Sequence, residues 1–239
     1  MEREEHGLSN AVLKWRHAFK LDPERVVSDE VLERLCLSGS DGIIVGGSSG
    51  VTYANTEDLL SRIRRFDMPC VLEVSELEAV VPGFDTYLIP MVLNTRNIDW
   101  LIGRHREAVQ RFGAIMPWDK IVAEGYIILN PASTAFRAAE AYLPEREDEI
   151  YALTEVADRL LHLPMIYIEY SGTFGDMALV HGIHARCAHA RLVYGGGIDG
   201  SARAADAARA ADLIVVGNLI YDNVEQALAT VHGVNDQRR

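Results

Sequence analysis

The feature that most constrains the fold of this chain is a repeated alternation of short apolar segments with longer helical patterns. Short apolar segments between helices are typical of the buried strands of a parallel sheet. Eight such units favour closure into a barrel, and the first strand lacks the G-x-G-x-x-G motif that often follows it in an open doubly wound sheet. We expect strands at His17–Leu21, Gly42–Val45, Cys70–Val74, Tyr87–Leu93, Ile121–Leu129, Met165–Tyr170, Arg191–Tyr194 and Leu213–Val216.

The predicted fold class is therefore α/β, a (β/α)8 barrel formed by residues 1–239 as a single domain, with an open doubly wound sheet as the alternative. Ser28 is the expected N-cap of the first main helix, and Asn55 or Thr56 that of the second, which reaches Phe66. One connection, Ser75–Asp85, has little room for a full helix. The other helices are expected at Ala11–Arg16, Asp29–Leu37, Asn97–Phe112, Glu145–Leu161, Asp176–Ala188, Ser201–Ala211 and Asp222–Val231.

The composition bears on partners and location. A formal net charge of -12 is unfavourable for binding a nucleic-acid backbone, so no nucleic-acid partner is expected. Cys36, Cys70 and Cys187 lack a metal-binding spacing and are interpreted as reduced thiols. Met1–His6 does not have the pattern of a signal peptide, and no apolar run is long enough to cross a bilayer, so we expect a cytoplasmic protein.

Glycines follow three of the predicted strands in the last third of the chain. They occur at Ser171-Gly172, at Gly195–Gly197 and at Gly217-Asn218. In βα barrels a phosphate group is commonly bound after the seventh and eighth strands, where glycine allows backbone N–H groups to approach it. The pattern therefore predicts one phosphate site, and the alternative is that these glycines only form tight turns.

Charged side chains at the strand ends indicate the chemistry. Glu169 is a carboxylate at the end of a buried strand, where it is costly without a partner or a function. Lys20 and Asp22 point the same way because strand side chains alternate. Lys20 is a candidate anion-binding residue. Asp22, with Ser48 from the next loop, is a candidate Mg²⁺ site, although both also suit ordinary turns.

Motifs at these positions resemble the geranylgeranylglyceryl phosphate synthase family, which includes the bacterial PcrB-type heptaprenylglyceryl phosphate synthases. The resemblance covers almost the whole chain, and the Tyr-x-Glu-Tyr-Ser-Gly motif is its most specific part. It implies a modified TIM (β/α)8 barrel with one peripheral helix missing or replaced, which agrees with the short connection. The motifs are Phe19–Pro23, Ile44–Ser48, Glu124–Pro131, Tyr167–Gly172, Tyr194–Ile198 and Val215–Asn218.

The resemblance also implies an activity, the transfer of a prenyl group from a polyprenyl diphosphate to the 3-hydroxyl of sn-glycerol 1-phosphate. This reaction forms the first ether bond of archaeal-type membrane lipids. By motif, Asp22 and Ser48 hold Mg²⁺. Our mechanistic hypothesis makes Glu169 catalytic, as a base or as a stabiliser of the allylic cation, and Tyr167 an assisting residue through its ring or hydroxyl, with packing as the alternative for Tyr167. The implied substrate site comprises Lys20, Tyr167, Ile168, Glu169, Tyr170, Ser171, Gly172, Gly197, Gly217 and Asn218.

The length of the prenyl donor depends on an apolar groove. Trp100, after the fourth strand, is either a core anchor, which we prefer, or a stop that suits a C20 tail. The expected donor is geranylgeranyl diphosphate, and the alternatives are the C35 donor of the bacterial type or a phosphosugar isomerase on the same fold. A non-catalytic phospho-ligand barrel is a further possibility. The resemblance also implies a homodimer and at most transient membrane contact.

Overall fold

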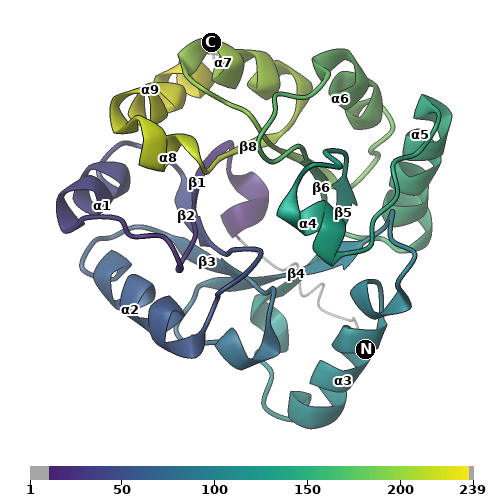
Figure 1. Ribbon diagram of the computed structural model, residues 1–239, viewed down its shortest axis with the longest axis horizontal. Coiled ribbons are helices and arrows are strands. Elements are labelled where there is room, and N and C mark those ends of the chain that lie inside the picture. The colour runs from purple at the N-terminus through teal and green to yellow at the C-terminus, as the bar shows by residue number, and fades with distance from the viewer. Residues whose placement is uncertain (1–10, 237–239) are drawn as a thin grey trace, which may run out of the picture.

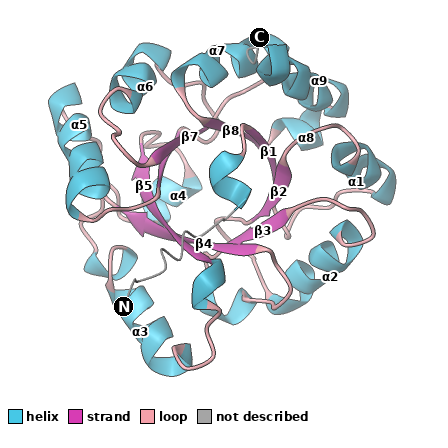
Figure 2. Cartoon of the chain, turned by 180° about the vertical axis from the view of Figure 1, so that it is seen from behind, coloured by secondary structure: helices cyan, strands magenta, loops and turns pink. Residues whose placement is uncertain are grey.

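The protein forms a closed barrel of eight parallel strands in a computed structural model that describes residues 11–236. Each strand pairs with the next along the chain, and β8 closes the ring by pairing with β1 (Figure 2). The predicted (β/α)8 barrel is confirmed, while the expectation for Met1–His6 lies outside the described residues. The strands are β1 His17–Leu21, β2 Gly42–Val45, β3 Cys70–Glu73, β4 Thr86–Val92, β5 Ile121–Ile128, β6 Met165–Glu169, β7 Arg191–Gly195 and β8 Leu213–Val216.

Helices surround the barrel, as Figure 1 shows. The α-helices are α1 Asp29–Cys36, α2 Tyr53–Ile63, α3 Gly103–Phe112, α4 Thr134–Ala138, α5 Glu147–Glu155, α6 Met177–His184, α7 Ser201–Ala210, α8 Leu219–Asp222 and α9 Val224–Asn235. Short 3-10 turns occur at η1 Ala11–Lys14, η2 Leu77–Ala79, η3 Ile98–Trp100 and η4 Trp118–Lys120, and α5 continues into a π-helical turn, η5 Val156–Leu160. None of the helices within residues 11–236 is long and apolar enough to span a bilayer.

The predicted start of α2 was too late in the chain. The helix follows Thr52, because the Thr52 side chain accepts the N–H of Asn55 while the Asn55 side chain accepts the N–H of Thr52. This reciprocal capping satisfies two N–H groups at the helix start. The last helix was also misplaced, since Asn223 caps it and it extends from Val224 to Asn235.

The helix expected at Asn97–Phe112 is divided into η3 and α3. The segment between β3 and β4, residues 74–85, is fully described and contains only the short turn η2. Figure 1 shows α3 at the edge of the molecule beyond β4, and α3 itself contributes no buried residue. The barrel therefore lacks one regular covering helix, as the resemblance implied, and its wall beside β4 and β5 is thinly covered.

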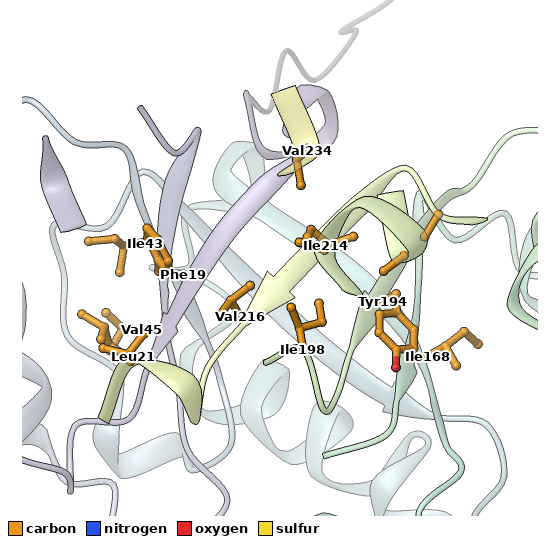
Figure 3. Close-up of a cluster of buried hydrophobic side chains, with 14 of the residues drawn as sticks. Phe19, Leu21, Ile43, Val45, Ile168, Tyr194, Ile198, Ile214, Val216 and Val234 are labelled. Atoms are coloured by element: carbon orange, nitrogen blue, oxygen red, sulfur yellow. The ribbon is translucent and has the colours of Figure 1, made fainter. Parts of the chain in front are cut away.

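Two apolar cores hold the barrel together. One lies between the strands and the helices and includes Phe19, Ile168 and Tyr194 (Figure 3). The other fills the barrel interior, where Val12 and Trp15 close the end formed by the strand N-termini. Trp15 lies so close to Gly42 that no Cβ would fit at that position. The predicted cap at Ala11–Arg16 is thus confirmed as η1, and the opposite end of the barrel is left open for a site.

Candidate active site

A cavity of about 1710 Å³ opens at the C-terminal ends of the strands. It brings together most of the predicted site residues: Lys20, Asp22, Ser48, Tyr167, Glu169, Ser171, Gly172, Gly197, Gly217 and Asn218. Two predicted residues lie elsewhere. The side chain of Ile168 is fully buried between the barrel and the helices, and Tyr170 packs against Tyr194. A substrate in this cavity would meet neither of these two side chains.

Glu169 ends β6 and is held on both carboxylate oxygens. The Tyr126 hydroxyl donates to Oε2 at 2.9 Å, and the backbone N–H of Ser171 donates to Oε1. Asn130 fixes this loop by donating to the Ser171 carbonyl. Burial raises the pKa of the 6% exposed Glu169 carboxyl, and Lys20 and the Tyr126 hydrogen bond limit that rise. A buried carboxyl with a raised pKa at the edge of a cavity suits a general base.

Lys20 projects from β1 into the same space. Its Nζ forms an ion pair with Glu73 Oε1 at 2.6 Å and lies 3.5 Å from the Tyr126 hydroxyl. Burial lowers the pKa of Lys20, but Glu73 and Glu169 outweigh this effect, and the pKa ends above its ordinary value. Lys20 therefore stays positively charged at neutral pH and can neutralise an anionic ligand.

Two stacked tyrosines form one wall of the site. The rings of Tyr126 and Tyr167 lie 4.6 Å apart with an angle of 17° between their planes. Burial, followed by the charge of Glu169, raises the pKa of both phenols well above its ordinary value, so both remain protonated. The rings offer an electron-rich face to a cation. The Tyr167 hydroxyl also occupies the place where a Cβ at Gly195 would lie.

The sequence-based reasoning missed three of these interior residues, Glu73, Glu124 and Tyr126. Glu124 on β5 is fully buried, and neither of its carboxyl oxygens has a hydrogen-bond partner among residues 11–236. Burial, followed by the nearby Glu73, raises the pKa of Glu124 well above its ordinary value, which favours the neutral form of this carboxyl. The signal that singled out Glu169, a carboxyl within an apolar strand, applies equally to Glu73 and Glu124.

The glycines after β7 and the glycine after β8 are needed for different reasons. Gly196 and Gly197 have positive φ angles, and a Cβ at either would collide with the backbone of the loop after β6, at Tyr170 and Phe174. Packing therefore explains both glycines without a ligand. At Gly217 the nearest atom to an added Cβ is the Lys20 carbonyl oxygen, 3.7 Å away. The fold alone does not demand glycine there, and its missing Cβ leaves room for a ligand.

Two arginines that the sequence analysis did not select line this end of the cavity. Arg25 donates to the Asn218 side chain at 3.0 Å and stacks 3.7 Å above the Tyr221 ring. Arg203 donates to the carbonyl of Gly197 at 3.0 Å. With Lys20 they bring three cationic side chains to the glycine end of the cavity, beside the carboxylates of Asp22 and Asp199, and Asp199 is paired with Arg203. Such side chains can bind the oxygens of an anion.

The residues predicted to hold Mg²⁺ lie on neighbouring loops. An added Cβ at Gly47 would lie 2.5 Å from Asp22 Oδ1, so the missing side chain lets the loop that carries Ser48 approach the carboxylate. Within the described residues no three His, Cys, Asp or Glu side chains are grouped to hold a metal. One carboxylate and one hydroxyl nevertheless fit a magnesium ion that takes its other ligands from water and substrate phosphates.

The cavity continues into an apolar groove beside the thinly covered wall. Ile89, Met91 and Ala123 line it from the barrel, and Phe112 and Trp118 from the segment after β4. Trp100 also lines the cavity, packs on the interior core and carries Arg104 4.2 Å from its ring. The site thus joins a polar, charged pocket to an apolar channel.

Comparison with known proteins gives a consistent picture. A model of the PcrB family matches residues 10–235. The heptaprenylglyceryl phosphate synthase of Geobacillus thermodenitrificans is 53% identical over 220 residues, 92% of each chain. That of Bacillus cytotoxicus is 51% identical over 226 residues, 95% of this chain and 99% of its own.

A solved structure supports the fold. The (S)-3-O-geranylgeranylglyceryl phosphate synthase of Thermoplasma acidophilum, in complex with sn-glycerol-1-phosphate, superposes with a TM-score of 0.82. It shares 22% sequence identity, and the match covers 99% of both chains. With the family match over nearly all of its length, the chain belongs to the PcrB family.

Proposed function

We propose that this protein transfers a prenyl group from a polyprenyl diphosphate to the 3-hydroxyl of sn-glycerol 1-phosphate. One observation carries the proposal: a buried carboxylate, Glu169, lies where a polar pocket with three cationic side chains meets an apolar groove in a single cavity. A small anionic acceptor matches the pocket, and a long hydrocarbon donor matches the groove. A phosphosugar isomerase would use the pocket but has no need of the groove.

The names of the relatives favour a C35 donor. The Geobacillus and Bacillus relatives, at 53% and 51% identity, are named heptaprenylglyceryl phosphate synthase, whereas the geranylgeranyl enzyme shares 22% identity. The sequence-based expectation was the C20 donor, although Trp100 was preferred as a core anchor over a stop for the tail. In the structure Trp100 packs on the interior core, in line with its role as an anchor. We therefore place heptaprenyl diphosphate first and geranylgeranyl diphosphate second.

The reaction follows from the positions of the side chains. The glycerol oxygen O3 forms a bond to C1 of the prenyl chain, and the C1–O bond to diphosphate breaks, with its electron pair leaving on the diphosphate. Glu169 accepts the proton of the attacking hydroxyl. Lys20 and the two arginines of the pocket hold the acceptor phosphate, and the Tyr126 and Tyr167 rings, which line the cavity, would stabilise the carbon that gains positive charge.

Asp22 and Ser48 are the residues that would hold Mg²⁺. When bound, the metal would neutralise charge on the departing diphosphate as a Lewis acid. Asp22 is half-buried, and burial raises the pKa of its carboxyl. A nearby cation would oppose that rise by favouring the ionised form.

A product assay tests the proposal. The protein is incubated with Mg²⁺, sn-glycerol 1-phosphate and prenyl diphosphates from C10 to C35, with sn-glycerol 3-phosphate as the control acceptor. We expect ether product from the 1-phosphate only, and fastest with the C35 donor. Highest turnover with the C20 donor would keep the reaction and change the donor. Absence of product with every donor would refute prenyl transfer.

A further inference from the structure

The carboxylate of Glu73 has one oxygen that the fold does not use. Glu73 ends β3, is 7% exposed and lines the cavity. Its Oε1 is paired with Lys20, but its Oε2 is buried and has no hydrogen-bond partner within residues 11–236. A buried carboxylate oxygen without a donor is costly. The arrangement therefore calls for a donor from a bound ligand.

Glu73 lies across the barrel from Glu169, since β3 and β6 are separated by two strands in one direction and by four in the other. The Tyr126 hydroxyl lies 2.9 Å from Glu169 Oε2 and 3.5 Å from Lys20 Nζ. Since Lys20 is paired with Glu73, these contacts link the two carboxylates. Lys20 is also the residue nearest to the open side of Gly217. Glu169 and Glu73 are thus linked through the Lys20 ammonium group, and the backbone of the same residue borders the glycine end.

The side chain of Glu73 has little freedom to turn away. An added Cβ at Gly46 would lie 3.0 Å from the Glu73 Cβ and 3.2 Å from its carbonyl oxygen, so the end of β2 packs tightly against it. The ion pair with Lys20 fixes the far end of the side chain. The unpaired oxygen is therefore held in place before any ligand arrives, as a selective binding site requires.

We propose that Glu73 accepts a hydrogen bond from the hydroxyl on the middle carbon of glycerol phosphate, the hydroxyl that is not alkylated. This inference rests on the proposed function. The phosphate lies at the glycine end, the reacting hydroxyl at Glu169 and the middle hydroxyl at Glu73. Three separate contacts distinguish mirror images, because the enantiomer would direct a hydrogen atom to Glu73 in place of the hydroxyl. Glu73 is thus the residue that selects the handedness of the acceptor.

The test compares binding of two acceptors by calorimetry. One is sn-glycerol 1-phosphate, and the other is 3-hydroxypropyl phosphate, which lacks the middle hydroxyl. For the unchanged protein we expect glycerol phosphate to bind about 10- to 100-fold more tightly, the effect of one hydrogen bond to a charged group. In Glu73→Ala the ratio falls to nearly one. The lost ion pair with Lys20 affects both ligands alike and cancels in the ratio.

A crossed control separates the two carboxylates. A second analogue, propane-1,2-diol 1-phosphate of the same handedness, lacks the reacting hydroxyl and keeps the middle one. Glu169→Gln should still prefer glycerol phosphate over 3-hydroxypropyl phosphate. It should lose the preference for glycerol phosphate over the propanediol phosphate. Glu73→Ala behaves in the opposite way and also loses the preference for sn-glycerol 1-phosphate over its enantiomer. If Glu73→Ala does not fold, Glu73→Gln replaces it, with an expected ratio between those of the alanine variant and the unchanged protein.

Equal binding of the two acceptors by the unchanged protein would overturn the inference. An unaltered ratio in Glu73→Ala, or in Glu73→Gln where that variant replaces it, would do the same. Product formation is measured separately on the unchanged protein. If no ether product forms but the binding pattern appears, prenyl transfer is rejected while the assignment of Glu73 to the middle hydroxyl stands.

Discussion

The hydrogen bond from Tyr126 to Glu169 makes a prediction about pH. Tyr126→Phe removes a donor 2.9 Å from the carboxylate and leaves the stacked ring in place. A hydrogen bond to a charged group contributes about 1.5–3 kcal/mol. Because Tyr126 and Glu169 are each 6% exposed, solvent does little to weaken this bond. The Ser171 N–H and Lys20 remain as partners, so we take the lower part of this range.

The lost bond destabilises the ionised form of Glu169, so the pKa of this carboxyl rises further. A base acts only when ionised, and the acid limb of the kcat/KM profile therefore moves to higher pH. On the acid limb, below both pKa values, the variant should be about tenfold slower, since 1.4 kcal/mol corresponds to a factor of ten. The difference should disappear as the pH rises.

The assay is the initial rate of ether formation across a pH series. Tyr151→Phe is the matched control, because it removes a tyrosine hydroxyl that bonds to Glu147 on α5, outside the cavity. We expect this control to follow the profile of the unchanged protein. If Tyr126→Phe has an unshifted profile, or is slower by one factor at every pH, Tyr126 does not act through the ionisation of Glu169.

Three further predictions concern stability, the ligand cradle and the groove. Glu124→Gln should unfold at the same temperature as the unchanged protein at acidic pH and be more stable by roughly 1 kcal/mol or more at neutral pH. The reason is that the raised pKa of Glu124 lowers the stability of the unchanged protein once this group ionises in the unfolded chain. Thermal unfolding at both pH values checks this. Gly196→Ala should destabilise the fold by about 1–3 kcal/mol. Gly217→Ala should have the free energy of unfolding of the unchanged protein but bind glycerol phosphate more weakly. Equal stabilities of the two variants would contradict this contrast. Trp100→Ala should leave the donor-length profile unchanged if Trp100 is a core anchor, and a shift towards longer donors would instead assign it a limiting role.

The strands were predictable from the sequence because each is an apolar segment between helices, and each observed boundary lies within one residue of the expected one. The helix starts were less predictable. The cap of α2 uses Thr52 with Asn55, in place of the more familiar glutamate or glutamine partner, and η3 interrupts the helix expected after β4. Near Gly103 the Asp99 side chain, four residues earlier, occupies the space of a Cβ, a local contact that periodicity does not reveal.

The site was predictable only in part, for a physical reason. Residues at strand ends, such as Lys20 and Glu169, can be located by counting strands, and both line the cavity. Glu73 also ends its strand, but its importance depends on the ion pair with Lys20, which joins β1 to β3 across the barrel. The hydrogen bond from Tyr126 depends in the same way on a partner 43 residues further along the chain.

The most direct test of the whole account is a single-turnover measurement on Glu169→Gln with both substrates at saturation. The account predicts that, with both substrates saturating, the variant forms the ether bond about 10²- to 10⁴-fold more slowly, the usual contribution of a positioned base. Full turnover with normal affinity for both substrates would contradict it, because the carboxylate at the end of β6 would then have no part in the chemistry.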